Sequence, residues 1–302
     1  ALDETTRRSL ELTRTLSEGK RDGSLLQVID HTCTPMGARL LAEYVASPLT
    51  APGLIDLRLE AVDELFRDAA LRGDLRGALD EAYDLERLAA RAATGRATPR
   101  DLAALARTLS LLPKVKARLS ARRSRRLAEL EEALELCPEV RAAIESALVE
   151  DPPLTIKEGG LIRAGFHEEL DRLRSASKDG KAWIARYQAE QIRRTGIAGL
   201  KVGFNNVFGY YIEISHAQAQ RGEVPADYIR KQTVKNAERY YTPELKEFEN
   251  EVRNADERAN ALEYELFIAL RDRVSADAPR LIQAGAAMAQ VDVLTGLAEL
   301  AA

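Results

Sequence analysis

The sequence predicts a mainly α-helical protein: a helical bundle carrying a long antiparallel two-helix stalk with a small antiparallel β-sheet at its tip. Three observations support this fold. Over most of the 302 residues, apolar residues recur every three or four positions, which is the period of an amphipathic helix. Near residue 200 the pattern changes to the two-residue alternation of strands. A heptad of apolar residues follows, which is typical of a helix packed along another helix.

Residues 1–160 are predicted to form the helical core domain. Apolar residues at helical spacing, such as Leu54, Leu57, Ala61 and Leu65, alternate with turn signals. The turn signals are Asp22-Gly23-Ser24, Thr34-Pro35, Ser47-Pro48, Ala51-Pro52-Gly53, Thr98-Pro99 and Leu112-Pro113. The spacing of these signals predicts several helices of medium length.

Residues 161–195 are predicted to form the ascending stalk helix, about 50 Å long at ~1.5 Å per residue. Asp179-Gly180 could interrupt or kink it. Residues 243–302 form the descending helix, with Thr242 as N-cap, and a last helix that returns to the core after Pro279. Because a β segment separates the two stalk helices, they must run antiparallel. The heptad positions of the descending helix are Leu245, Phe248, Val252, Ala255, Ala259, Leu262 and Leu266.

Residues 196–242 are predicted to form the β-rich tip. Strands are expected at 200–204, 210–215, 228–234 and 239–241, with a turn over 205–209. Half of the 16 aromatic residues lie between Phe204 and Phe248. A small sheet needs such residues because its core is thin and each ring buries a large area.

The tip carries the main functional signal, a local excess of positive charge. Between Tyr228 and Tyr240 four cations face a single acid, Glu238, in a chain whose net charge is −4. Cations attract phosphate, and amides and hydroxyls complete its oxygen contacts. Because the sequence predicts no recognition helix here, the tip would grip the duplex backbone without reading sequence. The candidate DNA-binding residues are Lys201, Asn205, Asn206, Arg230, Lys231, Gln232, Thr233, Lys235, Asn236 and Arg239.

Strand alternation divides residues 230–235 into two sets. The set that contains Val234 is expected to face inward, so the set expected to face phosphate is Lys231, Thr233 and Lys235. Two alternatives stay open. The cations could form a solvated sheet face, or the tip could dock on an acidic protein, which would make the chain a structural lever and protein-interaction module.

The sequence contains no constellation that supports catalysis or metal binding. His31, His167 and His216 are scattered, and no G-x-x-x-x-G-K-[ST] phosphate loop is present. We therefore expect no enzyme activity, cofactor or metal within these residues. The basic run 118–126 is followed by glutamates at 129–135, which favours helical ion pairs over an interdomain or phosphate contact.

Composition limits the class of protein further. A net charge of −4 excludes a wholly basic nucleic-acid binder, though not a local patch. No uninterrupted apolar run approaches the roughly 18 residues that span a bilayer, so no membrane partner is expected. Cys33 and Cys137 form no disulfide framework, which favours a cytoplasmic location. The chain begins without Met and closes inside an apolar helical pattern, so we expect a piece of a longer protein.

Several motifs, in order, resemble the MutS family of bacterial DNA mismatch-recognition proteins. The resemblance covers essentially the whole chain. Segments similar to the MutS clamp are Leu200–Asn205, Gly209–Ile212, Arg230–Tyr240 and Pro243–Lys246. Segments similar to the MutS core, or lever, domain and to the helix leading into the ATPase domain are Asp30–Gly37, Asp84–Leu88, Pro99–Leu102 and Val291–Leu294.

The resemblance implies a non-catalytic core, lever and clamp. Such a part grips duplex DNA non-specifically and transmits nucleotide-dependent movement from an ATPase domain that would follow Ala302. The longer parent would be a DNA-dependent ATPase using ATP and Mg²⁺, a homodimer, and cytoplasmic or nucleoid-associated when bound to DNA. Its mismatch-reading Phe-x-Glu motif belongs to another domain, so Phe166-His167-Glu168 is expected to pack within the stalk. An intact clamp favours a mismatch-repair parent.

Overall fold

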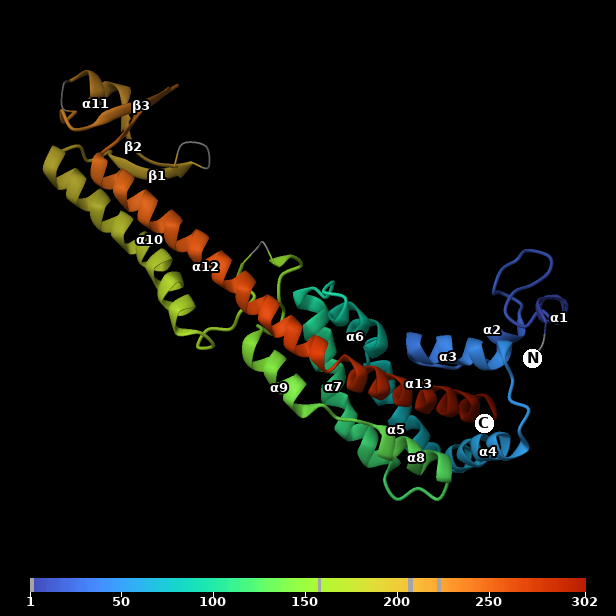
Figure 1. Ribbon diagram of the computed structural model, residues 1–302. Coiled ribbons are helices and arrows are strands. Elements are labelled where there is room, and N and C mark those ends of the chain that lie inside the picture. Colours follow the sequence, from blue (N-terminus) through green and yellow to red (C-terminus); the bar gives the residue numbers. More distant parts are fainter. Residues whose placement is uncertain (1–2, 157–158, 206–208, 222–223) are drawn as a thin grey trace. The chain divides into compact units, whose positions relative to one another are not determined.

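The computed structural model describes residues 3–156, 159–205, 209–221 and 224–302 (Figure 1). It consists of two compact units. Unit 1 comprises Ala1–Arg163 and Phe267–Ala302, and unit 2 comprises Ala164–Leu266. Helix α12, Pro243–Ala276, contributes residues to both units. The mainly helical fold with a small antiparallel sheet confirms the fold class that the sequence predicts.

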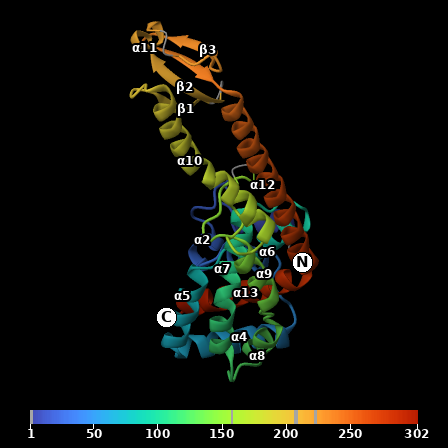
Figure 2. The ribbon, with the colours of Figure 1, turned by 90° about the vertical axis from the view of Figure 1, so that its left-hand side faces the viewer.

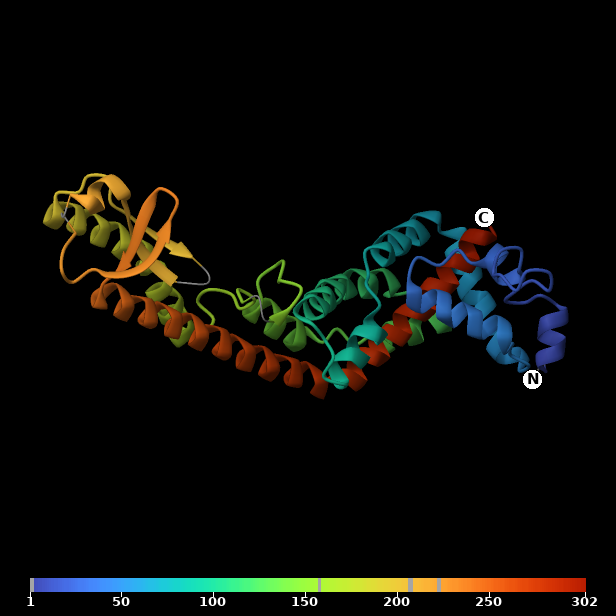
Figure 3. The ribbon, with the colours of Figure 1, turned by 90° about the horizontal axis from the view of Figure 1, so that it is seen from above.

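Unit 1 is a helical bundle around α13, Ala278–Leu300. Helices α3, α4, α5, α6 and α8 all pack against α13, which runs through unit 1 in Figure 3. By length and composition α13 could cross a membrane, but most of its apolar stretch is buried inside the unit, as in the core helix of a bundle. The other helices of the unit are α1 Glu4–Ser9, α2 Leu25–Ile29, α3 Pro35–Ala46, α4 Pro52–Arg67, α5 Ala69–Asp80, α6 Leu85–Ala93, α7 Pro99–Leu119, α8 Arg125–Ala133 and α9 Pro138–Ala147.

A buried carboxylate joins the start of α3 to α13. Asp292 accepts hydrogen bonds from the N–H groups of Cys33 and Thr34, both at 2.8 Å, and from Thr34 Oγ1 at 2.6 Å. Burial raises the pKa of Asp292 although these donors favour its ionised form. A Cβ on Gly37 would lie 2.1 Å from Asp292 Oδ2, so only glycine allows this approach.

In unit 2, helix α10, Glu168–Thr195, lies antiparallel beside the first part of α12 (Figures 1 and 2). The rings of Trp183 and Phe248 stack with centroids 3.8 Å apart, and Arg258 pairs with Glu169 at 3.1 Å. Every heptad position predicted on α12 is buried or half-buried. As predicted, Thr242 caps α12, because its Oγ1 accepts the Leu245 N–H at 3.1 Å.

The predicted start of the ascending helix at residue 161 is wrong. Residues 161–163 are extended and pair with the segment after α9: Arg163 N donates to Ala147 O at 2.8 Å. The reason is local, since Gly160 and Gly165 adopt positive φ angles of 72° and 84°, which end any helix. Phe166 therefore lies before α10 and is 42% exposed, rather than packed in a stalk helix. Beyond its start, α10 continues unbroken through residues 179–180.

The sheet of unit 2 has the strand order β1-β2-β4-β3, with all neighbours antiparallel. Its strands are β1 Lys201–Asn205, β2 Gly209–Ser215, β3 Ile229–Val234 and β4 Ala237–Tyr241. A short helix that the sequence did not predict, α11 (His216–Gln220), follows β2. One face of the sheet contributes Ile212, Ile214 and Tyr240 to a core that includes Tyr187 of α10.

Candidate nucleic-acid interface

A polar row crosses the sheet on the face opposite to this core. Lys201 pairs with Glu213, and Glu213 pairs with Arg239. Arg239 pairs in turn with Gln232, so the row runs through all four strands. Three of the predicted phosphate-binding residues, Lys201, Arg239 and Gln232, are thus brought to one face by strand register.

The two turns that carry further candidates lie at opposite ends of the sheet. Lys235 and Asn236 form the two-residue turn between β3 and β4, at the same end as Lys201. Asn205 lies at the other end, where it pairs with Gly209, and Asn206 lies outside the described residues. A five-residue strand at ~3.3 Å per residue separates the two ends by about 15 Å. The predicted residues therefore do not form a single cluster.

The strand alternation expected for residues 230–235 is wrong, because β3 contains a bulge between Arg230 and Gln232. A bulge adds one residue to a strand and shifts every later side chain to the other face. Arg230 and Thr233 consequently share a face, whereas Gln232 lies on the opposite one. The sequence contains no glycine or proline here that would have indicated the bulge.

The bulged residue, Lys231, is engaged within the protein. Its Nζ lies 3.4 Å from Tyr210 O and 5.4 Å from the centroid of the Tyr241 ring. Burial lowers the pKa of Lys231, because desolvation disfavours its charged form. Its assignment to DNA stays a prediction, and this geometry does not favour it.

Two further cations already have counter-charges. Arg230 Nε lies 2.7 Å from Glu238 Oε2, and Thr233 Oγ1 donates to the same carboxylate at 3.1 Å. Arg239 Nε lies 2.9 Å from Glu213 Oε2, and the Arg239 guanidinium stacks 4.1 Å above the Tyr211 ring. Gln232 Oε1 also accepts from Arg239, at 3.2 Å. These side chains are held in place by the sheet itself.

Whereas the exposed Arg230 and Thr233 are bonded to Glu238, three other exposed candidates are not: Lys201, Lys235 and Asn236. Within the described part of the chain their side chains have no hydrogen-bond or ion-pair partner. The turn that presents Lys235 is braced from behind, since His216 Nε2 lies 2.8 Å from Val234 O and the His216 N–H donates to Asn236 O at 3.3 Å. An exposed lysine on a braced turn can donate a hydrogen bond to a phosphate oxygen without first breaking an internal contact.

Sequence reasoning missed two residues of this unit. Arg221, just after α11, is an exposed cation, but it lies outside the basic segment 228–240 from which most of the candidates were chosen. Glu249 of α12 is buried and bonds to the start of β2 at Tyr210 N, 3.0 Å away. No local pattern identifies Glu249, because its partner lies 39 positions earlier in the chain.

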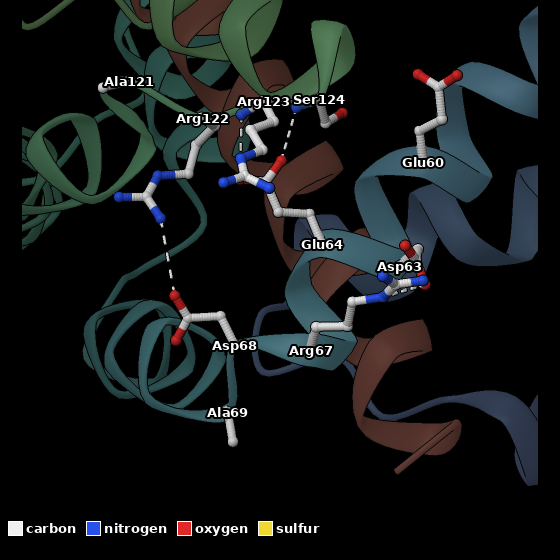
Figure 4. Close-up of a pocket in the computed structure, with 10 residues that line it drawn as sticks. All are labelled: Glu60, Asp63, Glu64, Arg67, Asp68, Ala69, Ala121, Arg122, Arg123 and Ser124. Carbon is white, nitrogen blue, oxygen red and sulfur yellow. Dashed lines mark hydrogen bonds and ion pairs between the residues drawn. The ribbon is translucent and has the colours of Figure 1, made fainter.

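The basic run 118–126 pairs with carboxylates, and the predicted pairing along the helix with residues 129–135 holds for Arg125 and Arg126 but not for Arg118. Arg118 pairs with Asp74 at 2.9 Å, and Arg125 and Arg126 pair with Glu129 at 3.0 and 2.9 Å. An adjoining groove of about 700 Å³ lies in unit 1 between α4 and the start of α8 (Figure 4).

The lining of this groove carries both charges, and its backbone donors are occupied. Glu64 accepts the N–H groups of Arg123 and Ser124 at 3.1 and 2.6 Å. Figure 4 shows Glu64 directed at these two groups. The groove is therefore a poor phosphate site. Among the described residues no group of three or more His, Cys, Asp or Glu side chains could hold a metal ion.

Comparison with known proteins agrees with the resemblance. The family model for MutS domain III matches residues 5–298. A DNA mismatch repair protein MutS from Rhodopirellula baltica is 52% identical over 301 residues, covering 100% of this chain and 34% of the relative. The MutS proteins of Symbiobacterium thermophilum and Salinibacter ruber are 49% and 47% identical, over 99% and 100% of this chain and 34% and 33% of their own lengths. The chain thus spans about a third of these relatives, and it belongs to the MutS domain III family, as part of a MutS-type DNA mismatch repair protein.

Proposed function

We propose that unit 2 is a clamp that contacts the sugar-phosphate backbone of duplex DNA without reading its sequence. The observation that carries this proposal is the exposed turn Lys235-Asn236, with Lys201 at the same end of the sheet and no acidic partner for either lysine among the described residues. Free cations are available for phosphate, whereas Arg230 and Arg239 would first have to leave Glu238 and Glu213.

The elements that are present favour contact with the backbone alone, because β3 and β4 belong to a four-stranded sheet and do not form a free two-stranded ribbon. Reading bases in the major groove requires an α-helix or a two-stranded ribbon inserted into the groove. The helix nearest to the turn, α11, has five residues and packs on β2 and β4. Contacts from a lysine and an amide on a tight turn suit phosphate oxygens, and binding should therefore depend strongly on salt.

We further propose that α12 transmits nucleotide-dependent movement from the ATPase domain of the longer protein to the sheet. The support is physical: α12 is one continuous helix of 34 residues, and its heptad side chains are buried or half-buried. ATP and Mg²⁺ would be held by that ATPase domain, because this chain contains no G-x-x-x-x-G-K-[ST] loop. A second subunit would complete a homodimer around the duplex, in the cytoplasm and on the nucleoid.

A protein-docking tip is the alternative, and one observation favours it. Phe204 is 57% exposed in the edge strand β1, where its ring contacts that of Tyr210 at a centroid distance of 4.9 Å. Exposed aromatic residues at a strand edge suit a protein partner better than a phosphate backbone. If the tip docks on protein through this edge, Phe204→Ser would abolish docking and leave duplex DNA binding absent in both forms.

The test is a titration of a fluorescently labelled DNA duplex with the chain, followed by anisotropy at low salt. The double variant Lys201→Glu, Lys235→Glu should lose binding. The matched control is Lys20→Glu, Lys114→Glu, which makes the same charge change at two exposed lysines of unit 1. Non-specific binding with Kd of about 10⁻⁴ to 10⁻⁶ M is expected for the parent chain and for the control. Equal binding by the double variant and by the control would refute the proposal.

A further inference from the structure

The backbone of Tyr210, at the start of β2, is held from two sides. Its N–H donates to Glu249 Oε2 of α12 at 3.0 Å. Its C=O lies 3.4 Å from Nζ of Lys231, the bulged residue of β3. One residue of the β1–β2 hairpin is thereby joined to the helix on one side and to the far edge strand on the other.

Glu249 is buried in a position where a charged side chain needs partners. It is 9% exposed, and its other oxygen accepts a hydrogen bond from Lys246 Nζ at 2.6 Å. Burial alone would raise the pKa of Glu249, but the hydrogen bonds from Lys246 and from the Tyr210 N–H outweigh it and lower that pKa. The carboxylate therefore stays ionised at neutral pH and keeps both acceptor oxygens.

The residue before Tyr210 is shaped for this contact. Gly209 has φ of +77°, and a Cβ built on it would lie 2.2 Å from Glu249 Oε2. Any other residue at position 209 would displace the carboxylate from the Tyr210 N–H, in addition to straining the backbone. The lack of a side chain at Gly209 thus allows the hairpin to approach α12 closely enough for this hydrogen bond.

The side chain of Tyr210 strengthens the same connection. Its ring lies 5.9 Å from that of Phe248, one residue before Glu249, and Phe248 stacks on Trp183 of α10. Both the main chain and the ring of Tyr210 are therefore attached to the helix pair. A displacement of α12 at Phe248 and Glu249 would carry the hairpin with it.

We propose that Glu249 is a positioning residue, which fixes the orientation of the β-sheet on α12 through its hydrogen bond to the Tyr210 N–H, with Lys231 bracing the C=O of the same residue. The inference rests on the proposed DNA contact of unit 2. It gives Lys231 an internal role in place of a phosphate contact. It also identifies the point at which movement of α12 would reach the sheet.

Simple electrostatics predicts the opposite effect, which makes the proposal testable. If Glu249 acted only through its charge, removing a carboxylate from the unit that binds DNA would strengthen binding, and Ala and Gln would act alike. If Glu249 acts through its hydrogen bond, Glu249→Ala should weaken binding, whereas Glu249→Gln keeps an oxygen acceptor for the Tyr210 N–H and should preserve it.

The experiment measures duplex binding and amide exchange on the same variants. Glu249→Ala should bind the labelled duplex about fivefold more weakly, and Glu249→Gln within about twofold of the parent chain. Hydrogen exchange followed by NMR should show the Tyr210 amide protected in the parent and in Glu249→Gln, and exchanging faster in Glu249→Ala. Protection of the Ile212 and Ile214 amides reports whether the sheet itself has stayed folded.

Two results would overturn the inference. Glu249→Ala could bind the duplex as tightly as the parent chain, or Glu249→Ala and Glu249→Gln could lose affinity equally. The Lys201→Glu, Lys235→Glu variant keeps the two proposals separate. If that variant loses binding while Glu249→Ala does not, the DNA contact stands and the positioning role of Glu249 fails. If Glu249→Ala unfolds the sheet, the test relies on Glu249→Gln alone. Loss of exchange protection at the Tyr210 amide in Glu249→Gln would then count against the hydrogen bond.

Discussion

The salt dependence of duplex binding tests which cations touch phosphate. Of the five cations that the sequence selects, the structure leaves Lys201 and Lys235 exposed and without an acidic partner in the described part of the chain. The other three, Lys231, Arg230 and Arg239, are engaged by Tyr210, Glu238 and Glu213. The structure therefore predicts two phosphate-contacting cations in one clamp.

Counterion release turns this count into a slope. Two contacts give a slope of about −1.8 in log K against log salt, and a loss of affinity of about 12-fold between 50 and 200 mM. Three cation contacts, as expected if Lys231 also reached phosphate, would give about −2.7 and a loss of about 40-fold. The two slopes differ enough for anisotropy titrations at four salt concentrations to separate them.

Variants of single residues then show which cations contribute to the salt slope. Lys235→Ala should reduce the slope to about −0.9, so that the same salt change costs about 3.5-fold. Lys231→Met should weaken binding through the lost contact with Tyr210 O but leave the slope near that of the parent. If Lys231→Met flattened the slope as much as Lys235→Ala does, Lys231 would contact phosphate, and the reasoning from its buried environment would be refuted.

Three further predictions concern the same unit. Glu238→Gln removes the counter-charge of Arg230, whose side chain is 61% exposed. Arg230 then becomes available for phosphate, which should steepen the salt slope of duplex binding by about 0.9. An unchanged slope would show that Arg230 does not reach DNA. Phe248→Ala removes the ring stacked 3.8 Å from Trp183 and should lower the free energy of unfolding by about 3–5 kcal/mol. Urea titrations followed by the fluorescence of this single tryptophan measure the loss, and a loss below about 1 kcal/mol would contradict the packing argument. Burial raises the pKa of Tyr228 to about 12. Its stabilising contribution is thus complete below the ordinary value of about 10 and is lost as pH rises toward 12. Tyr228→Phe should lose less stability than the parent chain over that interval, and equal losses in urea unfolding would show that Tyr228 does not cause the effect.

Much of the fold could be predicted because its signals are local. The heptad from Leu245 to Leu266 depends only on the 3.6-residue period of a helix, and the structure buries or half-buries its members. The four strands follow from short alternating runs separated by turns, and all four were found. The one wrong helix start, at 161 instead of 168, reflects two glycines whose positive φ angles outweigh an apolar pattern that looks helical.

The sequence by itself determined the family, the helical and strand periods, and the basic character of residues 228–240. Only the tertiary structure decided which of those cations are available. A bulge at Lys231 reverses the expected faces, because one extra residue changes the direction of every later side chain. Glu213 and Glu238 neutralise Arg239 and Arg230 through cross-strand pairing. Such pairing depends on register between strands that are distant in sequence, and for the same reason no local pattern could reveal the contact between Glu249 and Tyr210.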